Sequence, residues 1–492
     1  MSQRTVIPPN NQPPGDGSGS GPQTEAIGSS RSTTSWVFVL TALTLLSEEA
    51  AYAYNLVTPA LPSMAVALHT DQIAWVTTLF TLVGGVTAPL VGKIADMYGK
   101  KRVLLATTGV MVFGSLIVAS ASSFAIVLLG RGLEGTAVAI LPLTYSLMRD
   151  ILPKRLLPVG ISIAASGLGL TGILAPIIAG ALIDHFTYRG VFYFLVAFPM
   201  LLGLLVWAFV PESQVRARGR LNWRSALQLG AGIALILIGL SQAKAWHGGA
   251  PGYTVGGGVL VLVGWAWYEQ RLTEPFIDLS LLRTRAVLTT AVTQLTAQGA
   301  IALNLTLLSF MVQVPRSLGH AYGFGESASG LAKYTAPAGL ISMLMGFAVG
   351  FIVRRRGARM PLWMAFVAAG TGSLLIGTWH DQPWQVMLSF FVYAIGGGTL
   401  QAAIPNQVVA AVPPDNQAVS AGMVNLIGSI GTSVFVQIGF AILTAHIGMV
   451  AHGQPIYTGT GFVLAYYLTA AVCVVGLVAA LLMRHGTAKV GA

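Results

Sequence analysis

The chain has 492 residues, of which 54% are hydrophobic and only 9% are charged, and its formal net charge is +11 at pH 7. Soluble domains carry about 25% charged residues, so this composition excludes a water-soluble protein and predicts that most of the chain lies in lipid. The single cysteine, Cys473, excludes an intramolecular disulfide and a metal site built from several cysteines. We expect neither a metal nor an organic cofactor.

Residues 1–35 contain the stretch PPNNQPPGDGSGSGP and are rich in proline, glycine, serine and asparagine. This composition predicts a disordered tail. The apolar run that follows is too long, and begins too far along the chain, for a cleaved signal peptide. We therefore expect the tail to be retained.

Long apolar runs follow one another through the rest of the sequence. A membrane-spanning helix needs about 20 mostly apolar residues. Runs of this length predict an all-α membrane protein with fourteen spans, near 36–66, 72–94, 102–122, 124–148, 157–183, 190–211, 223–243, 252–270, 285–314, 325–353, 360–379, 384–411, 419–446 and 461–484.

The basic residues are distributed unevenly between the two sides of this arrangement. Most of the 27 lysines and arginines fall in loops on one side or in the terminal tails, and the loops of the other side hold only Arg189, Lys244 and Arg316. The positive-inside rule then predicts that both termini are cytoplasmic, which requires an even number of spans. It also explains the positive charge without a nucleic-acid partner.

Two loops of the sequence resemble each other. GKIADMYGKKR begins at Gly92, after the second predicted span, and GFIVRRRGAR begins at Gly350, after the tenth. The alignment pairs Gly99 with Gly357. Such internal echoes are typical of transporters built from structural repeats.

The first of these loops resembles the Gly-x-x-x-Asp-x-x-Gly-x-basic signature of the major facilitator superfamily. LLGRGLEGTAVA (128–139) resembles that family's fourth-helix arginine motif. TGILAPIIAGAL (171–182) is similar to the fifth-helix motif of its drug:proton antiporters, with Ala175 and Ala179 in place of glycines. Segments 274–285 and 404–434 are similar to the second half of the fourteen-span subgroup.

The resemblance implies two six-helix bundles that rock against each other around a midplane cavity. It divides the chain into a cytoplasmic tail (1–35), an N-terminal bundle (36–211), a linker with two additional helices (212–284), a C-terminal bundle (285–484) and a short tail (485–492).

In the family, the aspartate of the loop signature acts as a conformational latch. The resemblance assigns this role to Asp96, together with Gly92, Gly99, Lys101 and Arg102. A helix N-terminus favours an anion by roughly 0.3–1 kcal/mol, which gives such a latch a physical basis. The second loop has Arg354 at the aspartate position, so the first would carry the latch alone. The alternative is a loop charge that only anchors topology.

Charged residues interrupt two of the predicted spans in the N-terminal bundle: Glu48 and Glu49 in the first, Arg131 and Glu134 in the fourth. Each charge at a span centre costs about 2.5–3.5 kcal/mol. Counting helical rise puts the glutamates of the first span at nearly the height of Arg131, where Arg131 could compensate them. At least one carboxylate should then be neutral at rest and able to carry a proton. We favour Glu49 over Glu48, with Glu134 as a rival; the alternative is a static Glu–Arg pair.

Two further groups of residues are candidates for function. The fifth-helix motif, which implies antiport, comprises Gly172, Ala175, Pro176 and Gly180, although small residues also pack membrane helices generally. The candidates for the substrate cavity are polar or aromatic: Tyr52, Tyr54, Gln294, Gln298, Asn406 and Asn425. Isolated amides in spans more often bond to neighbouring helices.

These observations favour a proton-driven exporter of hydrophobic or amphiphilic small molecules in the plasma membrane, functional as a monomer and powered by the proton gradient. The alternatives are a proton symporter or a lipid or metabolite exporter of the same fold, and a membrane sensor or scaffold that transports nothing. A membrane enzyme is not expected, because the sequence has no clustered metal ligands and no nucleophile motif.

Overall fold

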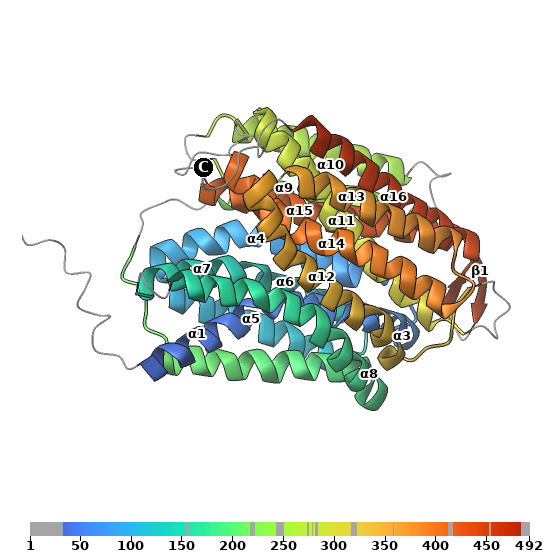
Figure 1. The fold of residues 1–492 in the computed structure, drawn as a ribbon, viewed down its shortest axis with the longest axis horizontal. Helices are drawn as coiled ribbons and strands as arrows, with labels where there is room; N and C mark the ends of the chain where they lie inside the picture. Colours follow the sequence, from blue (N-terminus) through green and yellow to red (C-terminus); the bar gives the residue numbers. More distant parts are fainter. Residues whose placement is uncertain are drawn as a thin grey trace, which may run out of the picture.

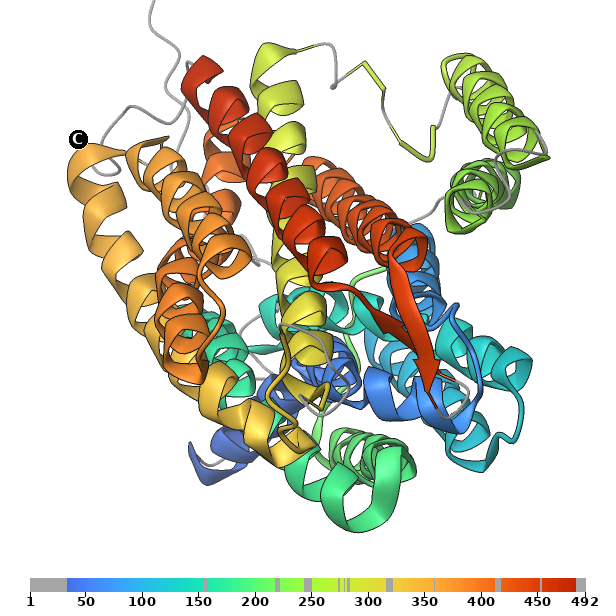
Figure 2. The ribbon, with the colours of Figure 1, turned by 90° about the vertical axis from the view of Figure 1, so that its right-hand side faces the viewer.

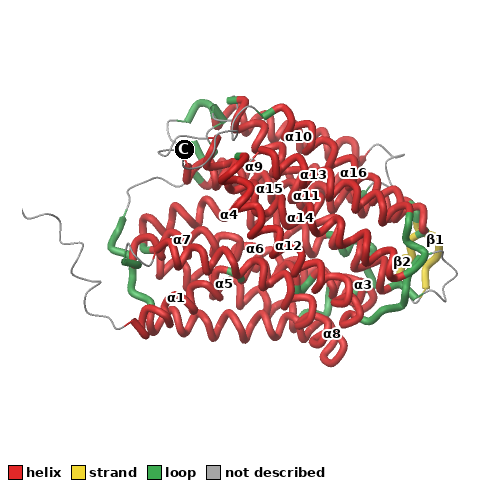
Figure 3. Tube along the Cα trace, in the orientation of Figure 1, coloured by secondary structure: helices red, strands yellow, loops and turns green. Residues whose placement is uncertain are grey.

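The computed structural model describes residues 33–153, 157–216, 222–242, 250–272, 275–277, 279–280, 284–315, 322–357, 359–411, 417–451 and 454–483. Its helices run along the long axis of the molecule, with one small β-hairpin at one end (Figures 1 and 3). We call this the hairpin end, and the opposite end, where the first helix begins and the last one finishes, the tail end. The hairpin consists of antiparallel strands β1 (Ile447–Ala451) and β2 (Gln454–Tyr457).

The N-terminal half contains the segments before residue 210. In chain order they are α1 (Thr33–Ser47), α2 (Glu49–Asn55), η1 (Thr58–Ala60), α3 (Leu61–Ala67), α4 (Trp75–Tyr98), α5 (Lys100–Ser120), α6 (Phe124–Gly135), η2 (Thr136–Ala139), α7 (Ile140–Ile151) and α8 (Leu157–Phe209). At Thr187 the φ of α8 is 61°, and the chain reverses there between two helical segments.

The linker and the C-terminal half follow. They contain α9 (Trp223–Ser241), α10 (Ala250–Glu269), α11 (Arg285–Gln313), α12 (Ala328–Arg356), α13 (Arg359–Thr378), α14 (Pro383–Ala411), α15 (Gln417–Ala445) and α16 (Gly459–Leu482). The pair α9–α10 stands at the edge of the molecule (Figure 2). An apolar cluster that includes Leu82, Leu229 and Ile233 holds α9 against α4.

Twelve segments of the described chain are long and apolar enough to cross a membrane, where the sequence predicted fourteen. Two differences explain the lower number. The segment Leu170–Phe209 counts once, although α8 reverses at Thr187. The 20-residue helix α10 is not among the twelve, because its glycines and aromatic residues lower its mean hydropathy.

The first predicted span, 36–66, is not one continuous helix. It breaks at Glu48, just after Ser47 donates its hydroxyl to the carbonyl of Thr44 at 2.6 Å, a bond that bends helices. It breaks again before η1, where Pro59 has no N–H to donate to the preceding turn. Neither break was predicted from the sequence.

The two glycines that the sequence repeat aligns have similar structural roles. Gly99 ends α4 with a φ of 121°, and Gly357 ends α12 with a φ of 76°. Side chains with a Cβ rarely adopt this backbone region. Both glycines therefore allow the sharp turn that returns the chain toward the bundle at the tail end.

Candidate functional site

A charged pair lies inside the N-terminal half, on α6. Arg131 and Glu134 are both completely buried, and Nη1 of Arg131 donates to Oε2 of Glu134. The other carboxylate oxygen accepts from the Ser115 hydroxyl at 2.5 Å. Arg131 Nε donates to the carbonyl of Val76 at 3.0 Å, and its guanidinium carbon lies 4.5 Å from the centre of the Phe80 ring. Most of the polar atoms of this pair therefore have partners.

Glycines let the surrounding backbones come close enough to provide those partners. A Cβ on Gly130 would lie 2.6 Å from the carbonyl oxygen of Gly114, and one on Gly135 would lie 2.5 Å from that of Phe80. Real Cβ atoms do not approach this closely. Helices α4 and α5 thus pack directly on the backbone of α6, and this brings Ser115 and Val76 to the charged pair.

Glu48 and Glu49 lie at the break between α1 and α2, and their side chains are 2% and 0% exposed. Oε2 of Glu48 accepts from the Thr171 hydroxyl of α8 at 3.2 Å. Within the described part of the chain, Oε1 of Glu48 and both carboxyl oxygens of Glu49 have no hydrogen-bond partner. Buried polar groups are nearly always hydrogen-bonded, so this site is unusual.

The expectation that Arg131 compensates Glu48 and Glu49 is wrong for this conformation. Arg131 forms its ion pair with Glu134, three residues further along the same helix. Helical rise fixes the depth of a side chain but not its direction, and Glu48 is directed toward α8. The spacing of Arg131 and Glu134, by contrast, brings two side chains of one helix together whatever their surroundings.

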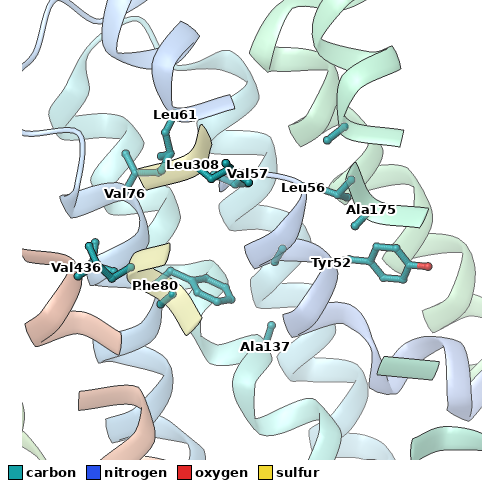
Figure 4. Close-up of a cluster of buried hydrophobic side chains, with 14 of the residues drawn as sticks. Tyr52, Leu56, Val57, Leu61, Val76, Phe80, Ala137, Ala175, Leu308 and Val436 are labelled. Carbon is teal, nitrogen blue, oxygen red and sulfur yellow. The ribbon is translucent and has the colours of Figure 1, made fainter. Parts of the chain in front are cut away.

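The two candidate tyrosines of α2 have different surroundings. Tyr52 packs edge-on against Phe198 of α8, with ring centroids 5.7 Å apart. Its ring points away from Phe80 and Val76 toward the green ribbon of α8 (Figure 4). The Tyr54 hydroxyl is buried and has no hydrogen-bond partner among the described residues.

The cavity candidates of the C-terminal half lie on α11, α14 and α15. Gln294 and Gln298 of α11 lie against Gly428 of α15, where the missing side chain makes room for them. Asn425 is exposed, and its carbonyl accepts from the Ser429 hydroxyl at 3.2 Å. The side chain of Asn406 lies outside the described residues.

The fifth-helix motif packs across the junction of the two halves. A Cβ on Gly180 would lie 2.5 Å from the Cα of Ser329 on α12, and Gly172 lies against Gly339 of the same helix. Ala175 is completely buried. Pro176 lies inside the helix. The motif therefore allows α8 and α12 to meet backbone to backbone.

At the tail end, the loop that contains Asp96 joins a network of charges. The buried Lys100 lies 2.5 Å from Asp150 and 3.7 Å from Asp96, whose side chain is 51% exposed. Asp150 also accepts from the Ser213 hydroxyl at 2.6 Å. The shorter contact of Lys100 is thus with Asp150, at the end of α7.

The N-terminus of α5, which begins four residues after Asp96, is bound by another carboxylate. Glu212, which follows α8, accepts from the backbone N–H groups of Lys101 and Arg102 at 2.9 and 3.0 Å. The side chain of Lys101 donates to the carbonyl of Trp207 at 2.8 Å. Lys100, Asp150 and Glu212 were not among the predicted site residues, because charged residues near the end of a span look like ordinary loop charges in the sequence.

Comparison with known proteins identifies the family. The model of the Major Facilitator Superfamily matches residues 50–436, which is most of the chain. The chain belongs to this superfamily. It is therefore a multi-pass membrane transporter of small molecules and not an enzyme.

Relatives within the superfamily are distant and varied. The chain is 26% identical to Multidrug resistance protein Stp of Mycobacterium tuberculosis over 404 residues, 79% of this chain and 71% of that protein. It is 25% identical to the Uridine/deoxyuridine transporter of Lactococcus lactis over 394 residues, 76% of this chain and 80% of that protein. A solved structure of peptide transporter POT with sulfate covers 92% of this chain and 96% of its own, at 14% identity and a TM-score of 0.66; this likeness shows the fold.

Proposed function

We propose that the protein is a proton-coupled antiporter that exports hydrophobic or amphiphilic small molecules by alternating access. The observation that carries this proposal is Glu49, a completely buried carboxyl group with no hydrogen-bond partner in the described structure. An ionised carboxylate in such a place is costly unless it is paired. Glu49 is therefore suited to hold a proton while buried and to release it when the bundle rearranges.

The surroundings of the three carboxyl groups rank them as proton carriers. Glu134 is bonded to Arg131 and Ser115, which stabilise its charged form. Glu48 has one donor, Thr171, and Glu49 has none among the described residues. We therefore assign proton transfer to Glu49 first, with Glu48 as the adjacent second candidate, and treat the Arg131–Glu134 ion pair as structural.

The direction of transport rests on two further observations. The fifth-helix motif of Gly172, Ala175, Pro176 and Gly180 resembles that of drug:proton antiporters, and the similar protein Stp is named for multidrug resistance. The likeness to the Uridine/deoxyuridine transporter supports a second candidate, proton symport of a nucleoside. The aromatic residues Tyr52 and Phe198 do not decide between the two candidates, because aromatic rings stack on hydrophobic drugs and on nucleobases alike.

The proposal includes an arrangement in the membrane. Counting α8 as two spans and α10 as one gives fourteen spans, divided between the two bundles and a linker at 212–284 as the sequence predicts. Both termini then lie in the cytoplasm, in the plasma membrane, and Asp96 lies on the cytoplasmic side as a latch. Each monomer would contain a complete transport path.

Exchange in proteoliposomes with an acidic interior tests the mechanism. The measurement is proton release after external addition of lipophilic cations, neutral drugs or uridine, for the wild type and for Glu49→Gln, Glu48→Gln and Glu134→Gln. An antiporter releases protons when substrate is added, and Glu49→Gln should abolish this release.

A symporter would give no such release, because its proton and substrate move in the same direction. Equal exchange by the wild type and all three variants would contradict a coupling role for the carboxylates. A wild type that moves no substrate of the panel, in liposomes where a known antiporter does so, would favour the sensor or scaffold alternative.

A further inference from the structure

The two halves are joined at the hairpin end by hydrogen bonds to the broken first span. The carbonyl of Thr58 accepts from the Ser309 hydroxyl, and the carbonyl of Pro59 accepts from the Gln313 amide, each at 3.1 Å. Pro62 has no N–H, so within its own segment the Thr58 carbonyl accepts from the N–H of Leu61, three residues on, instead of from position 62. The second break in this span thus supplies acceptors to α11 of the other half.

Asp184 adds a different kind of contact to the same junction. It lies near the hairpin-end limit of the first segment of α8, one turn beyond Gly180, whose backbone lies against Ser329. Its Oδ2 accepts from the backbone N–H of Ser329 at 3.2 Å. Ser329 belongs to the first turn of α12, whose N-cap is Ser327. A carboxylate of one half therefore binds the helix N-terminus of the other.

Two carboxylates, those of Asp184 and Glu326, lie at this end of α12, and they belong to different halves of the molecule. A helix N-terminus carries a partial positive charge and attracts an anion. Glu326 also lies at this end, but it belongs to the same half as α12 and pairs with Lys333 at 2.9 Å. That pair persists however the halves move. The contact of Asp184 with Ser329 exists only while the halves meet at the hairpin end.

We propose that Asp184 is a latch that stabilises the conformation closed at the hairpin end. Alternating access requires this end to open once in each cycle, and opening breaks the contact with α12. This role goes beyond the proposed antiport, because it applies to either direction of transport. With Asp184 at the hairpin end and Asp96 in the loop at the tail end, each end of the molecule then has an aspartate that can act as a latch.

The reactivity of a buried cysteine measures opening at this junction without substrate or gradient. Leu308 of α11 is completely buried and lies in the same cluster as Val57 and Leu61 of the N-terminal half (Figure 4). In a Cys473→Ser background, Leu308→Cys should react with a maleimide only when the junction opens. The rate in lipid nanodiscs is then proportional to the open population. Asp184→Asn should raise this rate about two- to five-fold, the change that loss of roughly 0.3–1 kcal/mol produces.

Two comparisons make the result decisive. Glu326→Gln removes a carboxylate from the same helix end without touching the junction, and should leave the rate unchanged. Asp184→Ala should raise it at least as much as Asp184→Asn. The exposed Met449, replaced by cysteine, reports on the reactivity of the maleimide itself and should react equally in all variants. An unchanged rate in both Asp184 variants, or an equal rise with Glu326→Gln, would overturn the latch. Neither result depends on whether the carboxylates of the first span carry protons.

Discussion

Glu134 and Glu49 are equally buried, but their carboxyl groups differ in hydrogen bonding. Both side chains are completely inaccessible. Glu134 has an arginine on one oxygen and a serine hydroxyl on the other, whereas Glu49 has no hydrogen-bond partner in the described part of the chain. The two groups therefore share their degree of burial and differ in the hydrogen-bond donors around them.

The comparison assigns different physical roles to the two groups. A carboxylate surrounded by donors is stabilised in one charge state and fixes the packing of its neighbours. A carboxyl group without donors is stable while protonated and unstable when ionised. Such a group can respond to a change in its surroundings. The following predictions test this difference, in order of decreasing effect on the free energy of unfolding.

Breaking the charged pair should have the largest effect. Arg131→Met leaves Glu134 buried without its cation, which should lower the free energy of unfolding by about 3–5 kcal/mol. The double variant Arg131→Met, Glu134→Met removes both charges, and its free energy of unfolding should equal that of the wild type or exceed it by about 1–4 kcal/mol. Denaturant unfolding in mixed micelles measures both. A double variant as unstable as the single one would mean that the pair is not a self-contained unit.

Removing the second donor of Glu134 should cost less. Ser115→Ala deletes a hydrogen bond to a charged group, worth about 1.5–3 kcal/mol, and the same unfolding measurement detects it. Ser120→Ala is the matched control. It lies on the same helix, but its exposed hydroxyl bonds to the carbonyl of Leu116 in the preceding turn. Equal stability of the two variants would show that Glu134 does not depend on its donors.

Replacing Glu49 should raise the free energy of unfolding, whereas the two changes above lower it. Glu49→Met removes a carboxyl group that has no partner in the described structure, and fills the space with an apolar chain of similar length. It should raise the free energy of unfolding by about 1–3 kcal/mol and abolish proton exchange. Glu134→Met, measured beside it, should lower stability. A loss of stability in Glu49→Met would reveal a partner in the native protein and make Glu49 structural.

Features of the structure that depend on local spacing can be related directly to the sequence. Gly99 and Gly357, aligned by the repeat, both adopt positive φ and end helices at the tail end. Arg131 and Glu134 meet because they are three residues apart on one helix. Membership in the superfamily follows from motifs of the same local kind, and the family match confirms it.

The features that depend on how helices face each other were not predictable. Glu48 was expected near Arg131 because depth can be counted along a helix, but its direction depends on the break at Ser47 and on Thr171, which is 123 residues away in sequence. The cap that Glu212 provides for α5 likewise joins residues that are 110 positions apart. A single sequence contains no signal for such contacts.

Replacing Thr171 tests whether Glu48 is a structural group, like Glu134, or a proton carrier, as proposed for Glu49. Its hydroxyl is the one hydrogen-bond donor to Glu48 among the described residues. Thr171→Val keeps the shape of the side chain and should lower the free energy of unfolding by about 0.5–1.5 kcal/mol, the usual worth of a hydrogen bond. Thr108 donates its hydroxyl within its own helix, so Thr108→Val controls for the loss of a hydroxyl.

If Glu48 is a structural group, the double variant Thr171→Val, Glu48→Gln should lose less free energy of unfolding than the sum of the losses in the two single variants. Proton exchange should then persist in both single variants. If exchange fails in Thr171→Val while stability is unchanged, Glu48 shares the proton with Glu49, and the two adjacent carboxyl groups act as one site.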